Sequence, residues 1–133
     1  AEEYLRFLEA VDRKEAAVHL DICNTMNNPR RFYSNSEFIP HTFGLLKEQI
    51  VTLHIKDIDL RPDVSVAMFQ EVLFGTGGMD CKVLMEEIAK LPEDIPAMLE
   101  HMETEEEYVK ATKAACEYAE KAGMHKEGLV WKL

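Results

Sequence analysis

Three short apolar runs, separated by stretches with helical periodicity, constrain the fold of this 133-residue chain more than any other feature. The runs at 16–22, 50–58 and 95–101 indicate buried strands, and the second is rich in β-branched residues. The spacing of apolar residues predicts helices before, between and after these strands. Strands that alternate with helices form parallel sheets, so we expect an α/β domain with about three parallel strands and four helices.

Local signals predict the helices and loops in the first half of the chain. Apolar spacing over residues 2–12 predicts an amphipathic helix. The stretch 24–36 is rich in Asn, Ser and Pro, which predicts a loop. A second helix is expected over 36–50, with Ser36 as a possible N-cap and Pro40 tolerated only near its first turn.

The second half of the chain begins with a long excursion, residues 59–80, which we expect to be a functional or disordered loop. Asp80 is expected to cap a helix over 81–91. Thr104 opens a capping-box pattern, and the helix that follows is expected to stop at Gly123. The short apolar tail after this helix is expected to dock on the rest of the domain.

Each predicted strand ends in a side chain that can bind a metal: Asp21, His54 and Glu100. The C-terminal ends of parallel strands meet at one edge of a sheet or barrel, so we expect these three to converge. Carboxylate and imidazole ligands suit Mn²⁺, Co²⁺, Zn²⁺ or Mg²⁺. Taken singly, a capping aspartate, a core histidine or a first-turn glutamate would explain each residue. Their joint occurrence at all three strand ends favours a divalent metal site.

Polar residues near these strand ends are candidates for substrate contacts. Asn24 could bond a substrate hydroxyl or satisfy loop backbone. Lys56 could bind an anionic or hydroxylated substrate, and Asp57 could orient that lysine or hold the neighbouring histidine. A solvated rim of ion pairs is the alternative for both. The glycine-rich segment 74–80 predicts a tight turn and only weakly indicates a phosphate site.

Charge, apolar run length and cysteine content bear on the partners and the location of the protein. A formal net charge of -10 argues against nucleic acid, although a local metal could still attract an anionic sugar phosphate. No stretch reaches the roughly 18 apolar residues of a membrane span, and the acidic start is unlike a signal peptide. Three cysteines without CxxC or CxxH spacing predict reduced thiols and a cytoplasmic protein.

Taken together, the chain resembles the C-terminal half of the xylose isomerase-like TIM-barrel superfamily. That superfamily includes sugar phosphate isomerases and epimerases, ketose 3-epimerases, inosose dehydratases and endonuclease IV. The resemblance implies that residues 1–133 form a single partial TIM-barrel domain, the C-terminal part of a (β/α)8 barrel with its strands six to eight. The segments that carry the resemblance are LDICN (20–24), VTLHIKDID (51–59), GTGGMD (75–80) and AMLEHMETEEEY (97–108).

The resemblance implies a divalent metal held by Asp21, His54 and Glu100. The family's first ligand is a glutamate from strand five, which has no counterpart here because the chain begins in the helix that would follow that strand. Glu100 falls on one of the two glutamates that move the proton in the family's epimerases. The implied reaction passes through an enediolate.

The resemblance also implies substrate contacts from Asn24, Lys56 and Asp57, the last two matching the family's common HxKD run. Leu60 occupies the approximate place of an arginine that contacts substrate in some epimerases, and Arg61 beside it is the substrate-binding residue that the resemblance implies. The particular sugar therefore stays open.

We accordingly expect part of a divalent-metal-dependent sugar or sugar-phosphate isomerase or epimerase that is inactive alone. Open sheet edges predict pairing with the missing barrel half or with further copies of the chain. The alternative is a non-catalytic half-barrel subunit or folding unit. An abasic-site endonuclease or inosose dehydratase activity is less favoured. Whether the chain itself is an enzyme is left open.

Overall fold

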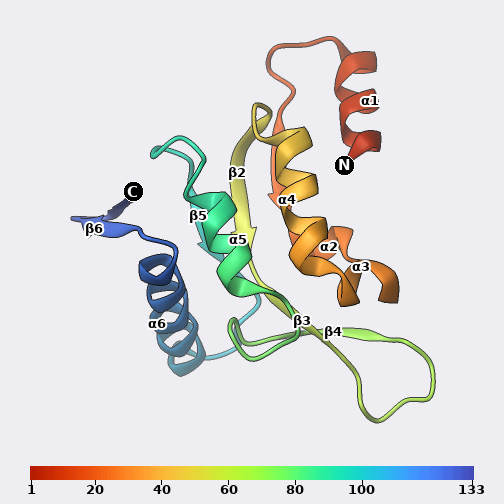
Figure 1. Cartoon of the computed structure of the whole chain (residues 1–133), viewed down its shortest axis with the longest axis vertical. Coiled ribbons are helices and arrows are strands. Elements are labelled where there is room, and N and C mark those ends of the chain that lie inside the picture. The colour runs from red at the N-terminus through yellow and green to blue at the C-terminus, as the bar shows by residue number, and fades with distance from the viewer.

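A three-stranded parallel sheet lies at the centre of the computed structural model, which describes residues 1–133. Its strands are β1 (Val18–Asp21), β2 (Ile50–Ile55) and β5 (Ala97–Leu99), in the order β1-β2-β5. Their C-terminal ends lie at the same end of the sheet (Figure 1). The expected α/β fold with three parallel strands is confirmed, although each strand is shorter than its apolar run.

Four long helices match the helices predicted from apolar spacing, and two short ones were not expected. Helices α4 and α5 lie over one face of the sheet, and α6 flanks β5 (Figure 1). The helices are α1 (Glu2–Val11), α2 (Ile22–Thr25), α3 (Pro29–Tyr33), α4 (Asn35–Leu46), α5 (Cys81–Ile88) and α6 (Glu105–Lys121).

The expected loop over 24–36 is wrong in part, because α3 and the end of α2 lie within it. Asp21 caps α2 and Asn28 caps α3, each accepting a hydrogen bond from the backbone N–H three residues on, at 3.3 and 3.0 Å. Pro29 occupies the first turn of α3, where its missing N–H costs little. Helices this short are too brief to show apolar periodicity, so only their capping residues indicate them in the sequence.

Helix α4 begins at Asn35, one residue earlier than expected, and Ser36 does not cap it. The Ser36 hydroxyl instead donates to the Asp80 carboxylate at 2.7 Å, which ties α4 to the start of α5. Pro40 lies inside the helix, beyond the first turn that was expected to hold it. Asp80 caps α5 as predicted, accepting from the backbone N–H of Val83 at 3.1 Å.

A hairpin replaces much of the long loop expected over 59–80. Strands β3 (Asp57–Leu60) and β4 (Phe69–Val72) pair antiparallel, and their hairpin projects from the body of the domain (Figure 1). The strand expected over 50–58 is therefore two strands that break at Lys56. Each hairpin strand has only four residues, too few for alternation to distinguish a strand from a loop.

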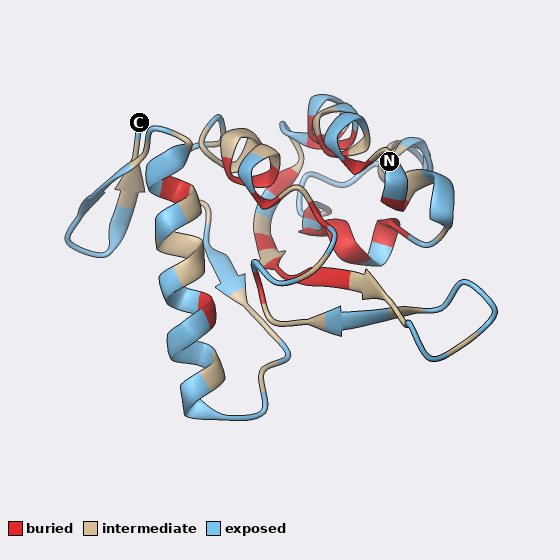
Figure 2. Ribbon diagram, turned by 60° about the horizontal axis from the view of Figure 1, so that its bottom comes forward, coloured by how far each residue is buried: buried red, intermediate tan, exposed pale blue.

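The core lies between the sheet and its covering helices. Figure 2 shows buried residues concentrated in β1, β2 and the facing sides of α4 and α5, whereas α6 is mostly exposed. Leu20, Leu53 and Leu84 are among the fully buried side chains. Each such burial stabilises the fold by roughly 1.5–3 kcal/mol, so the core holds the sheet and α5 together.

The C-terminal part confirms the predicted capping box. Thr104 accepts from the Glu107 backbone N–H, and the Glu107 carboxylate accepts from the backbone N–H of Thr104. Gly123, with a φ of 88°, follows the end of α6. The helix therefore begins and ends where its caps predicted.

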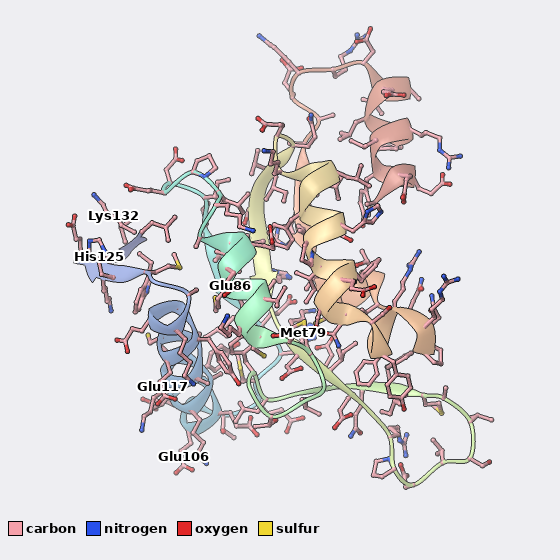
Figure 3. The ribbon with its side chains drawn as sticks, viewed as in Figure 1. Met79, Glu86, Glu106, Glu117, His125 and Lys132 are labelled. Carbon is pink, nitrogen blue, oxygen red and sulfur yellow. The ribbon has the colours of Figure 1, made fainter.

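The tail forms a second hairpin from β6 (His125–Glu127) and β7 (Val130–Lys132), in which His125 pairs with Lys132 (Figure 3). It borders a largely apolar cavity of about 680 Å³ between β5, α5 and α6. Trp131 is half-buried, whereas Leu129 is 95% exposed, so the tail docks only in part. No helix combines the length and apolar character that a membrane span requires.

Candidate metal centre

The register of the parallel sheet brings the three strand-end side chains together. Asp21 pairs with His54 across β1 and β2, and His54 pairs with Met98 across β2 and β5. Glu100 lies two residues beyond Met98 and therefore points to the same face. One ligand atom from each of Asp21, His54 and Glu100 lies within 4.8 Å of the other two. The convergence expected from the sequence is present in the structure.

These three side chains line an open pocket of about 320 Å³ at the C-terminal end of the sheet. Asp21 is nearly buried, whereas His54 and Glu100 are partly accessible. A small polar molecule could therefore reach the two more exposed groups. The remaining residues that line the pocket are Tyr4, His19, Asn24, Lys56 and His101.

Lys56 is the most buried charged group of the pocket, with a side chain only 4% exposed. Its ammonium lies 2.9 Å from Asp21 Oδ2 and 2.6 Å from Glu100 Oε2. Burial is the largest influence and alone would lower the pKa of Lys56, but the hydrogen bonds to Glu100 and Asp21 together outweigh it. The pKa of Lys56 is therefore raised, and the side chain stays charged.

The Glu100 carboxylate lies close to several positively charged or polar side chains. Its Oε2 lies 2.8 Å from His54 Nδ1 as well as close to Lys56, and its Oε1 lies 3.6 Å from His101 Nε2. The hydrogen bond from Lys56 is the main reason that the pKa of Glu100 is lowered. Glu100 is therefore an ionised carboxylate whose two oxygens face different neighbours.

Glu71 and His101 extend the cluster, and sequence reasoning assigned neither of them a role. Glu71 lies on β4, and its Oε1 is 3.4 Å from the Lys56 ammonium. Its other oxygen pairs with His101 Nδ1, and His101 has a φ of 61°, a conformation that few non-glycine residues adopt. Only the pairing of β4 with β3 brings Glu71 here, and no local sequence signal announces that pairing.

Asn24 and His19 hold the ligand side chains in place. Asn24 Nδ2 donates to Asp21 Oδ2 at 2.9 Å, and Asn24 also lines the pocket. The ring of His19 packs edge-on against that of His54, with centroids 4.1 Å apart. Asn24 therefore lies where a substrate contact was expected, and it orients Asp21 as well.

Asp57 does not reach this pocket, although its sequence position predicted a substrate contact. Its side chain is 1% exposed, and its carboxylate accepts hydrogen bonds from four backbone N–H groups at 2.8 to 3.2 Å. Burial is the largest influence and raises the pKa of Asp57, while these hydrogen bonds oppose the rise. Asp57 holds a loop in place and offers no opening to a ligand; the donors are Ile58, Gly75, Gly77 and Met79.

Arg61 also lies outside the pocket. It follows β3 in the projecting hairpin, where its guanidinium pairs with the carboxylate of Asp63. The guanidinium is already paired with this carboxylate, and the pocket lining contains no arginine. The substrate contact expected of Arg61 finds no counterpart in this geometry.

The donor set fits a divalent cation. Two carboxylates and one imidazole combine the hard oxygen and borderline nitrogen ligands of Mn²⁺, Co²⁺, Zn²⁺ and Mg²⁺ sites. Three carboxylates and one ammonium leave the cluster with a formal excess of two negative charges when its histidines are neutral. A dication would balance that excess, and an open pocket side leaves room for further ligands.

Comparison with known proteins gives one match. A family model described as xylose isomerase-like TIM barrel matches residues 1–122, which is nearly the whole chain. No curated protein and no solved structure matches the chain significantly. The matched range includes all three strand-end side chains and the glycine-rich loop.

Proposed function

Because this chain belongs to the xylose isomerase-like TIM-barrel family, which includes sugar isomerases and epimerases, we propose that it carries the metal-binding part of such an enzyme. The family expected from the sequence is confirmed. The proposed reaction is a divalent-metal-dependent isomerisation or epimerisation of a sugar or sugar phosphate. Proton transfer next to a carbonyl, through an enediolate, is its chemical step.

The convergence of Asp21, His54 and Glu100 carries this proposal. They come from three adjacent parallel strands that are far apart in sequence, yet their ligand atoms lie within 4.8 Å of one another. In barrels of this kind the reactive side chains lie at the C-terminal ends of strands. The location and the donor chemistry therefore support the same function.

The proposed division of work follows from the contacts of each ligand. Asp21 is held by Asn24, and His54 is held by the ring of His19, so both are oriented before any ion arrives. A divalent cation bound between the three ligands would polarise a ketose carbonyl and its neighbouring hydroxyl. Preoriented ligands lose little conformational entropy when they bind, which favours a defined geometry.

Glu100 is the proposed proton-transfer group. Its Oε2 faces His54 and Lys56, whereas its Oε1 faces His101 across 3.6 Å. One oxygen can therefore serve the ligand cluster while the other receives a proton from a carbon beside the carbonyl. The lowered pKa of Glu100 keeps it ionised, which is the form that a proton acceptor needs.

We expect the 133-residue chain alone to be inactive, because its sheet forms only one wall of a pocket. Three parallel strands are present, whereas a closed barrel of this class uses eight. Stereochemical inversion at carbon needs a second proton-transfer group on the opposite face of the sugar. That group would come from strands that pair with the open edges of β1 and β5.

Calorimetric titration of the purified chain with Mn²⁺ tests the proposed site. Wild type should bind one ion, and Asp21→Ala or His54→Ala should abolish binding. His41→Ala is the matched control, because His41 is an exposed histidine that pairs with Glu2 outside the pocket. Unchanged binding in both ligand variants would refute the assignment.

An activity assay tests the expected inactivity of the isolated chain. Ketoses and ketose phosphates, incubated with the chain and Mn²⁺, should show no solvent deuterium incorporation and no epimer. Turnover that follows the chain through purification, and disappears with Glu100→Gln, would show that the chain is a complete catalyst.

A non-catalytic half-barrel subunit is the second candidate, and exposed apolar side chains in the central sheet favour it. Val51 and Met98 are 54% and 44% exposed although they lie in strands of the central sheet. Apolar strand residues of this kind usually pack against another layer or partner. This candidate predicts stable assemblies in light scattering without Mn²⁺ binding, which the titration distinguishes from the enzyme.

A further inference from the structure

The ammonium of Lys56 contacts the carboxylates of two of the three proposed metal ligands, Asp21 and Glu100. It lies 2.9 Å from Asp21 Oδ2 and 2.6 Å from Glu100 Oε2, and only 4% of the side chain is exposed. His54 Nδ1 is 2.8 Å from that same Glu100 oxygen. Lys56 is therefore inside the ligand cluster.

An ammonium and a divalent cation compete for these carboxylates at close range. Two positive charges a few ångströms apart repel strongly in a partly buried site, where water screens them poorly. A metal that binds Asp21 and Glu100 must therefore displace the ammonium or leave it bound less closely. The displaced ammonium still needs a partner, because a buried unpaired charge is costly.

Glu71 offers that partner. Its Oε1 lies 3.4 Å from the Lys56 ammonium, which is longer than the contacts to Asp21 and Glu100. It comes from the β3–β4 hairpin, outside the three strands that supply the metal ligands. A short movement of the lysine side chain toward Glu71 would exchange two carboxylate partners for one.

We propose that Lys56 is a built-in competitor of the divalent metal, and that Glu71 receives its ammonium when the metal binds. This inference rests on the metal site proposed above. Without metal, the lysine then offsets one of the two negative charges of Asp21 and Glu100 and lowers the affinity of the site for cations. With metal, the Lys56–Glu71 pair keeps the whole cluster close to neutral.

Mn²⁺ calorimetry on Lys56→Met tests the competition. Removal of the competing charge should tighten Mn²⁺ binding about tenfold, since each tenfold corresponds to only about 1.4 kcal/mol. Lys82→Met is the matched control, because Lys82 pairs with Glu86 of α5 outside the pocket and should leave affinity unchanged. Figure 3 shows the position of Glu86. Circular dichroism melts verify that both variants are folded.

Glu71→Gln tests the receiving carboxylate. Mn²⁺ binding should weaken several-fold in the wild-type background, and most of that loss should disappear when Lys56→Met is also present. Equal losses in both backgrounds would overturn the role of Glu71, because they would reflect only its general negative charge. Glu86→Gln, which removes an exposed carboxylate of α5, is the control and should not alter binding.

The outcomes separate this inference from the metal site itself. A folded Lys56→Met protein that binds Mn²⁺ no more tightly than wild type, while His54→Ala abolishes binding, would overturn the competition and leave the site intact. Absence of Mn²⁺ binding in both wild type and Lys56→Met would overturn the proposed site as well. Binding in Lys56→Met but not in wild type would support both.

A second measurement needs no variant at the lysine. The side-chain ¹⁵Nζ resonance of Lys56 in the wild-type chain should shift as diamagnetic Zn²⁺ is added, and the shift should saturate with one ion. In the Glu71→Gln protein the shift should differ, because the receiving carboxylate is gone. A Lys56 resonance that stays unchanged at Zn²⁺ saturation would show that the ammonium does not move, against the proposal.

Discussion

The loop between β4 and α5 passes so close to Asp57 that Gly77 has no room for a side chain. A Cβ atom at Gly77 would lie 2.4 Å from Asp57 Oδ1 and 2.5 Å from the Ile58 carbonyl oxygen. Real Cβ contacts begin near 3.0 Å, and ordinary contact needs about 3.4 Å. Gly77→Ala must therefore displace the loop or the carboxylate by roughly 1 Å.

That displacement breaks hydrogen bonds to a buried charge. Asp57 accepts from the backbone N–H of Gly77 at 2.8 Å, of Gly75 at 3.1 Å and of Met79 at 3.2 Å. A hydrogen bond to a charged group contributes about 1.5–3 kcal/mol, so the loss of one or two costs about 3 kcal/mol. This is a large part of the roughly 5–15 kcal/mol by which domains are stable.

Urea unfolding followed by circular dichroism measures the cost. With a urea m-value of about 2 kcal/mol/M, the midpoint of Gly77→Ala should fall by about 1.5 M. Gly44→Ala is the control, because its Cβ would meet nothing within 4 Å and alanine favours the helix by about 1 kcal/mol. If Gly77→Ala unfolds at the wild-type midpoint, Asp57 does not hold this loop and the reasoning fails.

Three further outcomes follow from local structure. Thr104→Ala should lower the unfolding free energy by about 1 kcal/mol in urea titrations, since it removes the N-cap of α6. Backbone hydrogen bonds from residues 103 and 104 lower the pKa of Glu107 below its ordinary value of 4.5. The stabilisation that ionised Glu107 contributes is therefore present above pH 4.5 and is lost as the pH falls through the lowered pKa. When the pH is lowered through this range, the urea midpoint should drop less in Glu107→Gln than in wild type. Cys116, which is only half-buried, should react first with a thiol reagent, whereas Cys23 and Cys81 are buried, with pKa values raised by burial, and should react only on unfolding.

The elements that could be predicted are those whose signals lie within a few residues. The capping box at Thr104 and the cap at Asp80 each involve a backbone N–H three residues away, so the sequence alone contains the whole interaction. The positions of Asp21, His54 and Glu100 at strand ends could be predicted from short apolar runs that each end in a polar residue. Parallel strands in neighbouring positions then bring these residues together without further information.

The features that could not be predicted depend on contacts between distant segments. Glu71 reaches the pocket only because β4 pairs back onto β3, and Asp57 is drawn away from it by the loop that contains Gly77. Gly78 likewise depends on a distant segment, since a Cβ there would lie 2.3 Å from the ring of Phe32, more than 40 residues earlier in the sequence. A glycine-rich segment indicates close approach, but the sequence does not name the partner.

The alternation of side chains along β1 and β2 makes the core and the candidate site a single structural constraint. Leu20 and Leu53 are buried beneath the helices, and their neighbours Asp21 and His54, one residue on, reach the pocket. A slip of one residue between the strands would turn a carboxylate toward the core and an apolar side chain toward the pocket. Burial of the leucines opposes that slip, because exposing either one costs roughly 1.5–3 kcal/mol. The apolar packing beneath the helices thus fixes which side chains face the pocket, although it lies on the opposite face of the sheet.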